Sequence, residues 1–437
     1  MTFKYLARVL ALALLFGACA ERGGAPTAPP SAVGSATVAP ASGLERAPHA
    51  IFGPLRRWYV LPTPEFREDA RVAVTFPDTD PTPGRPRARL RSNGRVVDLT
   101  KVAELPASWQ ATIPLDGVTP GPQQIEIIVR LRDGTDAALA TRDFLLSAPE
   151  FVVWTLDFEG DAAGDAELAN TAAIADRFRV PMTLMWNPRV WTTSQVSAAR
   201  ADAMLAWTKE RAAKGDEVAL HLHMWTDFVR AAGVTPRTSP SWAGRSDGYD
   251  VPMTAFNEAE VRILLDYSIL RMLDHGLPRP VTFRAGGQFA DATTVRVVSG
   301  AGFVADCSGV PAGGFGRLVY PWTLGADAQP YHPSSQDANA PGDLPLLEAP
   351  TIGGNTYGYD ANTIAPIVRS DRSLLRPEGE VAIERRAITL VSHPGTIVAT
   401  ERAAIEALFG ALEPLRYDRD VGPLRFVTLA GLARAWR

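Results

Sequence analysis

The 437-residue chain contains very little cysteine and histidine, with two and six residues respectively. Two cysteines cannot form a disulfide framework, and the absence of a Cys-x-x-Cys pair excludes a zinc ribbon. Lysine is also scarce, and the formal net charge is only -4, so no broad basic surface for nucleic acid is expected. Any metal or acid–base chemistry must therefore come from carboxylates and a few histidines.

The first residues are typical of an export signal. Lys4 and Arg8 accompany an apolar run from Val9 to Phe16, which is too short to span a bilayer permanently. The small residues that follow, ending in Cys19, resemble a bacterial lipoprotein signal, in which Cys19 would carry the lipid that anchors the chain to the membrane. Ordinary signal cleavage after Ala20 would instead give a secreted or periplasmic protein. Both readings place the protein in the extracytoplasmic cell envelope.

Composition and patterning divide the chain into four parts. Residues 1–19 are predicted to be the signal peptide, and residues 20–52, rich in Ala, Pro, Gly, Ser and Thr, a flexible linker. Residues 53–148 show short alternating apolar runs between turn signals, which predicts an all-β immunoglobulin-like sandwich. Residues 149–437 alternate apolar strands with helical stretches. This pattern predicts an α/β fold, specifically an irregular (β/α) barrel.

Ionisable residues directly follow four of the predicted barrel strands. Because α/β barrels carry their active sites at the carboxyl ends of the strands, we expect these side chains to lie close together. They are Asp157 and Glu159 after the strand 151–156, His221 and His223 after 217–220, Arg284 after 281–283, and His393 after 388–391.

These residue types suit metal-assisted acid–base chemistry. Asp157 and Glu159 are two residues apart, so on an extended backbone both side chains point to the same side. One of them can then bind a divalent metal while the other acts as a base. His221 and His223 have the same spacing, which suits two imidazole ligands on one ion. His393 is a candidate general acid, because imidazole titrates near neutral pH. These residues could instead have structural roles. Asp157 and Glu159 would then stabilise the start of the following turn, His221 and His223 would be structural histidines, and His393 would be a hydrogen-bonded loop histidine.

The stretch from about residue 150 to the end resembles the polysaccharide deacetylases of carbohydrate esterase family 4. Five motifs occur in the family's order, although several depart from its usual pattern. They are Thr-Leu-Asp-Phe-Glu-Gly at 155–160, Gly-Asp-Glu-Val-Ala-Leu-His at 215–221, Phe-Arg-Ala-Gly-Gly at 283–287, Thr-Leu-Val-Ser-His at 389–393 and the closing Phe-Val-Thr-Leu at 426–429.

The resemblance implies a set of catalytic roles. Asp157 would be the catalytic base, steered by Arg284, and His393 would be the general acid. The backbone N–H near Gly287 would help to hold the oxyanion, although the aromatic residue usual in this motif is missing. Glu348 is the candidate for the acid that orients His393, with Asp306 as the alternative.

The resemblance also implies a divalent metal, with Zn²⁺ favoured, and its ligands. These would be Glu159, His221 and His223, with Asp161 as the alternative to Glu159. The family usually has its second His four residues after the first, a position that holds Trp225 here, so His223 is the replacement. Trp225 is then a candidate for contact with the substrate.

The implied function is metal-dependent hydrolysis of N-acetyl groups on an extracytoplasmic polysaccharide. Water at the metal would attack the acetyl carbonyl, with Asp157 as base and His393 as acid. An N-acetylated polysaccharide is the expected partner, and nucleic acid is not. Hydrolysis of an O-acetyl ester or a small C–N substrate remains open, as does a tethered carbohydrate-binding lipoprotein with an inactive barrel. A His-x-His amidohydrolase is disfavoured, because no lysine follows His223.

Overall fold

The computed structural model describes residue 44 and residues 47–77, 85–105, 107–368 and 374–437. The predicted signal peptide, the lipidation site at Cys19 and most of the predicted linker lie outside the described residues. Among the helices of the described part, none combines the length and the apolar character that crossing a bilayer requires.

The first described elements are all strands, which form two sheets around one apolar core. One sheet has the order β1-β3-β7-β6 and the other β2-β9-β8-β4-β5. The immunoglobulin-like topology stays a prediction. The strands are β1 (Ile51–Phe52), β2 (Trp58–Val60), β3 (Ala70–Thr75), β4 (Arg87–Leu90), β5 (Val96–Asp98), β6 (Thr100–Lys101), β7 (Ser108–Ile113), β8 (Gly121–Arg130) and β9 (Asp136–Ser147).

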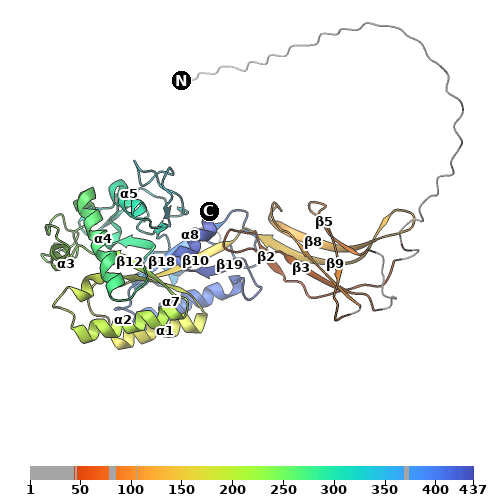
Figure 1. The fold of residues 1–437 in the computed structure, drawn as a ribbon, viewed down its shortest axis with the longest axis horizontal. Helices are drawn as coiled ribbons and strands as arrows, with labels where there is room; N and C mark the ends of the chain where they lie inside the picture. The colour runs from red at the N-terminus through yellow and green to blue at the C-terminus, as the bar shows by residue number, and fades with distance from the viewer. Residues whose placement is uncertain (1–43, 45–46, 78–84, 106, 369–373) are drawn as a thin grey trace, which may run out of the picture. The chain divides into compact units, whose positions relative to one another are not determined.

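From residue 150 onward the chain forms a parallel sheet with helices between its strands, so the α/β prediction is confirmed (Figure 1). The order is β17-β14-β13-β12-β11-β10-β18, and β19 also pairs with β10. These strands are β10 (Glu150–Asp157), β11 (Met182–Trp186), β12 (Glu217–Leu222), β13 (Thr282–Ala285), β14 (Ala305–Asp306), β17 (Leu347–Glu348), β18 (Arg386–Ser392) and β19 (Leu424–Val427). A small hairpin joins β15 (Gly314–Phe315) to β16 (Leu318–Val319).

The barrel is irregular because one part of its wall is not a strand. Between β17 and β18 the chain runs beside β18 without forming a ladder of its own. The Gly353 N–H donates to the Thr389 carbonyl at 3.1 Å, and the Val391 N–H donates to the Gly354 carbonyl at 3.0 Å. The sheet is therefore curled but open along this edge.

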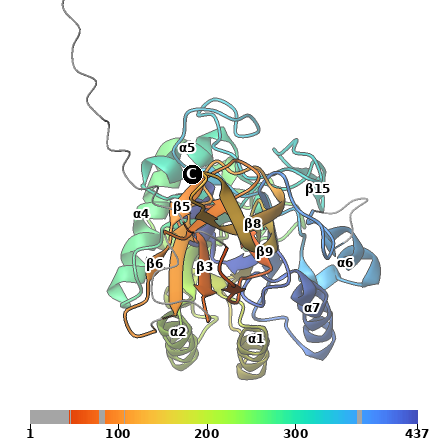
Figure 2. The same ribbon diagram turned by 90° about the vertical axis from the view of Figure 1, so that its right-hand side faces the viewer.

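Helices alternate with the strands of the parallel sheet, and α1 and α7, which pack against each other, can be followed in Figure 2. Two helices begin with side-chain caps that the sequence shows: Ser197 accepts from the Arg200 N–H, and Asn257 and Glu260 form the predicted capping box. The α-helices are α1 (Asp165–Phe178), α2 (Ala198–Ala213), α3 (Thr226–Ala231), α4 (Glu258–Asp274), α5 (Ala292–Gly300), α6 (Ala361–Val368), α7 (Ala399–Leu412) and α8 (Leu429–Trp436). Short 3₁₀ helices are η1 (Pro188–Trp191), η2 (Met253–Ala255), η3 (Gly286–Gln288), η4 (Thr356–Gly358) and η5 (Glu413–Leu415).

The strand β10 shows how the two faces of the sheet differ. All its residues are buried, as expected for a central parallel strand. Val152, Trp154 and Leu156 pack in the core that includes the surrounding helices. Phe151 and Val153 point to the other face, where residues of α8 fill the interior of the curled sheet. Alternation along the strand therefore gives the interior an apolar floor and leaves later residues of the same face for the site.

Glu150 begins β10 and is fully buried, although it is a carboxylic acid. One oxygen accepts the Arg376 N–H at 2.7 Å, and the other has no hydrogen-bond partner. Burial raises the pKa of Glu150 from 4.5 to about 7, against smaller opposing effects of the Arg376 N–H and the charges of Arg386 and Arg376. The folded protein therefore binds this proton more tightly than the unfolded chain does.

The raised pKa of Glu150 predicts a pH-dependent contribution to stability. The contribution of the neutral carboxyl is fully present below about pH 4.5 and is lost as the pH rises to about 7. Wild type should therefore lose up to about 3 kcal/mol relative to Glu150→Gln between pH 4.5 and pH 8. Urea unfolding of both proteins at the two pH values checks this, with the exposed Glu210→Gln as control. A gap between wild type and Glu150→Gln that does not change with pH would contradict it.

Candidate metal and acid–base site

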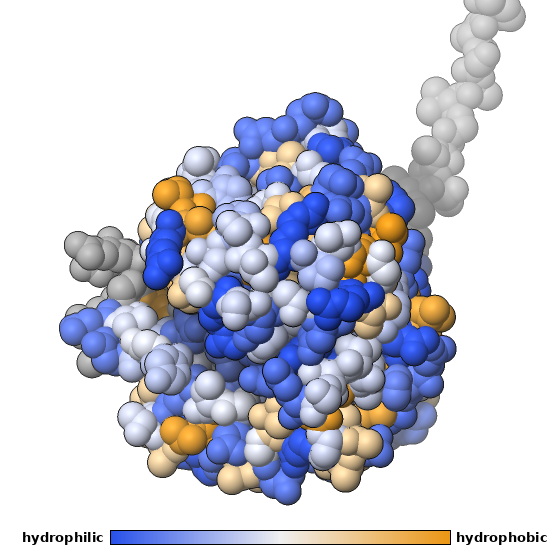
Figure 3. Space-filling view, turned by 90° about the vertical axis from the view of Figure 1, so that its left-hand side faces the viewer, coloured by the Kyte–Doolittle hydropathy of each residue, from blue (hydrophilic) through white to orange (hydrophobic). Residues whose placement is uncertain are grey.

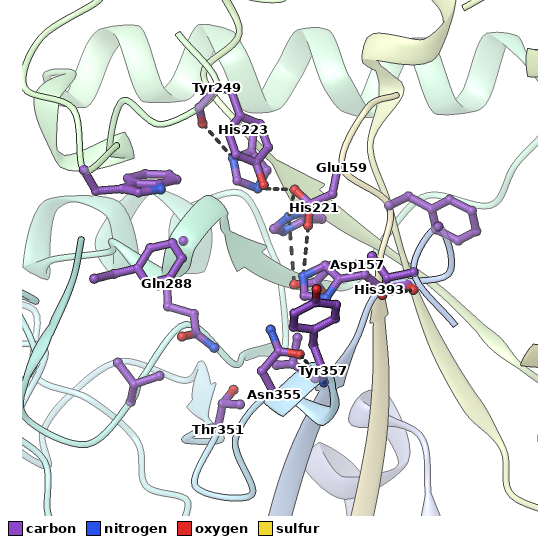
Figure 4. Close-up of a pocket in the computed structure, with 18 of the residues that line it drawn as sticks. Asp157, Glu159, His221, His223, Tyr249, Gln288, Thr351, Asn355, Tyr357 and His393 are labelled. Atoms are coloured by element: carbon purple, nitrogen blue, oxygen red, sulfur yellow. Dashed lines mark hydrogen bonds and ion pairs between the residues drawn. The ribbon is translucent and has the colours of Figure 1, made fainter. Parts of the chain in front are cut away.

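The carboxyl ends of four parallel strands meet above the apolar floor of the curled sheet. The structure brings together there five of the predicted ionisable residues, Asp157, Glu159, His221, His223 and His393, at or just after the ends of these strands (Figure 4). The sixth, Arg284, forms an ion pair with Asp157. Their convergence follows from the alternation of side chains along a strand. Thr155 and Asp157 on β10, His221 on β12 and Arg284 on β13 all point to the inner face of the curled sheet.

A cavity of about 680 Å³ opens over these residues. The ionisable residues line its base, except for Arg284, which is buried behind Asp157. Aromatic side chains line its walls, and Tyr357 and Phe315 among them are exposed, by 73% and 48% respectively. The face of the molecule in Figure 3 is mostly hydrophilic, with small separate hydrophobic patches.

Asp157 and Arg284 form a buried ion pair. Arg284 Nη1 donates to Asp157 Oδ1 at 2.7 Å and to the Thr155 hydroxyl at 2.6 Å. The other guanidinium nitrogens donate to the Cys307 carbonyl and to the Thr351 hydroxyl. Arg284 is therefore fixed on every side, and it holds one carboxylate oxygen of Asp157 while the other faces the site.

Three side chains converge on one point beside Asp157. Glu159 Oε2 lies 2.5 Å from His223 Nε2 and 3.9 Å from His221 Nε2. These three residues form a group whose candidate ligand atoms lie within 4.8 Å of one another. His221 Nε2 is buried and has no hydrogen-bond partner. Buried polar atoms normally have a hydrogen-bond partner, so a buried nitrogen without one, close to a carboxylate and a second imidazole, is a candidate metal ligand.

The second nitrogen of each imidazole fixes the ring. His221 Nδ1 lies 3.1 Å from the Arg284 carbonyl oxygen, and His223 Nδ1 lies 2.8 Å from the Tyr249 carbonyl oxygen. Because a carbonyl can only accept, each Nδ1 carries a proton, and in the neutral ring Nε2 presents its lone pair to the site. Metal-binding histidines are oriented by such backbone contacts. The residues present therefore fit a divalent cation.

The surroundings of His223 leave it no room to turn. Its ring stacks on Tyr249, with ring centroids 4.1 Å apart. On another side the backbone passes so close that a Cβ at Gly286 would lie 2.7 Å from His223 Nδ1. Gly286 is therefore needed in the third motif for the close approach of β13 to this ring.

The charges of the site act on each other strongly. Burial would raise the pKa of Glu159, but His223, His221 and His393 hold it well below its usual value. For His393 burial acts to lower the pKa, but the hydrogen bond and charge of Glu159 outweigh it, and the pKa rises to about 8. His393 Nε2 lies 3.1 Å from Glu159 Oε1, so His393 and His223 contact the same carboxylate from two sides.

A further acid near His393, Glu401, is one that sequence reasoning missed. Glu401, buried in α7, accepts from the Thr396 hydroxyl at 2.8 Å, and the oxygen of that hydroxyl lies 3.0 Å from the His393 carbonyl oxygen. Its charge adds to the rise in the pKa of His393. The sequence carries one signal for it, because Glu401 lies in the first turn of α7, the helix that follows the His393 motif.

Glu348, the predicted partner of His393, does not line the cavity and points away from the inner face of the sheet. Leu347 and Ala349, on either side of it, belong to the core inside the curled sheet, so Glu348 points to the opposite face. There it accepts the Gly309 N–H at 2.8 Å and pairs with Asp306, its neighbour on β14. Burial raises the pKa of Glu348 well above its usual value, and the Asp306 charge adds to this.

Three further candidates take different places. Gly287 lines the cavity and has a positive φ of 60°. Asp161 also lines the cavity, but it is not part of the group formed by Glu159 and the two histidines. Trp225 is buried, with 5% exposed, and is not among the residues that line the cavity. Its indole N–H donates to the Glu159 carbonyl at 2.9 Å.

No family model and no curated protein sequence matches the chain. Solved structures with a similar fold include a protein assigned to the polysaccharide deacetylases from Mycobacterium smegmatis, with 16% identity and a TM-score of 0.38, covering 65% of this chain and 89% of that one. Peptidoglycan deacetylase PdaC from Bacillus subtilis has 12% identity and a TM-score of 0.32, covering 66% and 92%. A family 4 carbohydrate esterase from Streptomyces lividans has 12% identity and a TM-score of 0.31, covering 60% and 87%. These three proteins are described as deacetylases or as a family 4 carbohydrate esterase.

Proposed function

We propose that residues 149–437 form a metal-dependent hydrolase that removes N-acetyl groups from a polysaccharide outside the cytoplasm. The observation that carries the proposal is the meeting, in one cavity, of a metal-ligand group with an oriented carboxylate and a third histidine. Each of these came from a motif that resembles the same family. The proposed metal ligands, base and acid all line the same cavity.

Glu159, His221 and His223 are the residues that would hold the divalent ion, for which Zn²⁺ is the favoured choice. When bound, such an ion polarises an acyl carbonyl and makes a water molecule more acidic. All three residues line the cavity, so the group is accessible to a substrate there.

Asp157 is the proposed base. Arg284 engages Oδ1, so Oδ2, which lies 3.9 Å from His221 Nε2, is the oxygen left to accept a proton from the attacking water. The buried guanidinium keeps this carboxylate in one orientation. Arg284 thus acts on the base rather than on the substrate.

His393 is the proposed acid. It follows β18, whereas Asp157 ends β10. His393 contacts Oε1 of Glu159, and His223 contacts Oε2. Its side chain is 21% exposed to the cavity, so it can donate a proton to the nitrogen of the leaving amine. The backbone N–H near Gly287 is the proposed donor to the oxyanion.

The walls of the cavity suit a carbohydrate. Trp242, Tyr249, Phe315, Tyr320 and Tyr357 offer aromatic surface beside polar groups such as Gln288 and Asn355. A sugar ring presents apolar faces and a polar edge, so a cavity of this mixed kind can bind it. The export signal in the sequence agrees with a substrate in the cell envelope, and the anchor at Cys19 belongs to the same proposal.

Acetate release from a panel of substrates tests the function. The panel consists of N-acetylated glucosamine oligomers, intact peptidoglycan and O-acetylated xylan, each with wild-type protein. The proposal expects acetate from at least one N-acetylated glycan. Release from O-acetylated xylan alone would make the protein an esterase. Binding of glycan with no release from any substrate would favour a tethered carbohydrate-binding protein instead.

A further inference from the structure

Two side chains that no catalytic step uses hold the loop that carries Glu159. The Trp225 indole N–H donates to the Glu159 carbonyl at 2.9 Å. Arg189 Nη1 donates to the next carbonyl, that of Gly160, at 2.8 Å. Two successive peptide groups that follow the Cα atom of Glu159 are therefore fixed by donors from outside the loop.

Arg189 is itself held in place on all its nitrogens. Asp227 accepts from Nε and Nη2, both at 2.8 Å, and Gln195 accepts from Nη2 at 2.7 Å. Only 1% of the Arg189 side chain is exposed. A planar guanidinium with this many acceptors has one position, so the Gly160 carbonyl is bound by a fixed group rather than a mobile one.

The two donors also contact each other. The Arg189 guanidinium lies over the Trp225 ring, 3.7 Å from its centroid. Trp225 in turn contacts Tyr249, with ring centroids 4.9 Å apart, and Tyr249 stacks on His223. A continuous series of ring contacts therefore connects Trp225 and Arg189, which hold the loop of Glu159, to Tyr249, which packs on the second ligand, His223.

The loop lies too close to this support to move past it. Gly160 has a φ of +86°, and a Cβ there would lie 3.0 Å from the Arg189 Cβ and from Asn187 Oδ1. The turn directly after Glu159 thus requires glycine in both its conformation and its space. Because the backbone of this turn is held in one place, the position of the adjacent Glu159 side chain is restricted as well.

We propose that Trp225 and Arg189 are positioning residues that set the carboxylate of Glu159 for metal binding. The inference rests on the proposed function, because it takes Glu159, His221 and His223 as the ligands. It gives Trp225 the role of orienting a ligand in place of contact with the substrate. Outer partners of this kind contribute about 10-fold to 100-fold to the metal affinity of known sites.

Trp225→Phe tests the role of the indole N–H, because it keeps an aromatic ring against Arg189 and removes only the donor and part of the ring. We expect the Kd for Zn²⁺, measured on the metal-free full chain by competition with a chromogenic chelator, to rise about 10-fold to 100-fold. The absorption spectrum of the Co²⁺-loaded variant should also change, since it reports the arrangement of the ligands. A residue that only fills space would move neither readout.

Trp58→Phe is the matched control. Trp58 is fully buried in β2, and its indole N–H has no hydrogen-bond partner, so this change removes the same atoms without removing a donor to the loop. Its Zn²⁺ affinity should equal that of wild type. Arg189→Lys is the second variant if Trp225→Phe does not fold, because lysine keeps the charge but cannot reach Gly160, Asp227 and Gln195 together.

The outcomes separate this inference from the function on which it rests. Weaker Zn²⁺ binding by Trp225→Phe or Arg189→Lys, with Trp58→Phe unchanged, supports the positioning role. Zn²⁺ binding by the folded variants as tight as that of wild type overturns it and leaves the proposed function standing. If wild type itself binds no Zn²⁺, the proposed ligand set is wrong and this inference falls with it.

Discussion

Replacing Asp157 with Asn is expected to lower the rate of acetate release about 10³-fold while the chain still binds its metal. The amide keeps the size of the carboxylate and an oxygen for Arg284 Nη1, but it can no longer accept a proton from water. Loss of a general base typically costs between about 10²-fold and 10⁴-fold in rate. Asp157 belongs to a second possible ligand group, with Glu159 and His393, but not to the group proposed to hold the ion, so the Kd for Zn²⁺ should stay close to that of wild type.

The matched control for this variant is Asp202→Asn, which makes the same change on the exposed face of α2. It should leave the rate as it is in wild type. Thermal unfolding of both variants separates loss of chemistry from loss of fold, since Asp157→Asn also takes the counter-charge from buried Arg284. If the folded Asp157→Asn protein kept more than about a tenth of the wild-type rate, Asp157 would not be the base.

The second large effect is expected from His221→Ala. This change removes a buried imidazole whose Nε2 has no partner other than the implied ion. The Kd for Zn²⁺ should rise by more than about 100-fold, the upper end for the loss of an outer partner, because a direct ligand is lost. Acetate release at micromolar Zn²⁺ should fall to the background level.

Competition with a chromogenic chelator measures this affinity on the full chain. His275→Ala is the control, because His275 ends α4 and stacks on Trp191, outside the cavity. It should bind Zn²⁺ as wild type does. Equal Zn²⁺ affinity of His221→Ala and wild type would remove His221 from the ligand set.

The core of the site could be predicted because it follows from local rules. Asp157 and Glu159, like His221 and His223, are two residues apart at the end of apolar strands, and parallel strands bring their carboxyl ends to one edge of the sheet. The helices α1 and α4 could be predicted for the same reason, since the residue pattern of each and the capping box of α4 are local.

The rest depends on contacts that are distant in sequence or on strands too short to show a pattern. β14 and β17 have two residues each, so the direction in which Glu348 points depends on their register. β9 mixes exposed charged residues with alanine and is held mainly by its ladder to β8, so its own sequence gave little signal. The hydrogen bond from Trp225 to Glu159 joins residues 66 positions apart and has no local signature.

The measurement that tests the central claim most directly is acetate release by wild-type protein that has been stripped of metal and then titrated with Zn²⁺. A hydrolase built on Glu159, His221 and His223 should be inactive after stripping. Its activity on an N-acetylated glycan should return in proportion to added Zn²⁺ and level off near one ion per chain. Full activity in the stripped protein, or no activity at any Zn²⁺ concentration on any glycan of the panel, would contradict the claim.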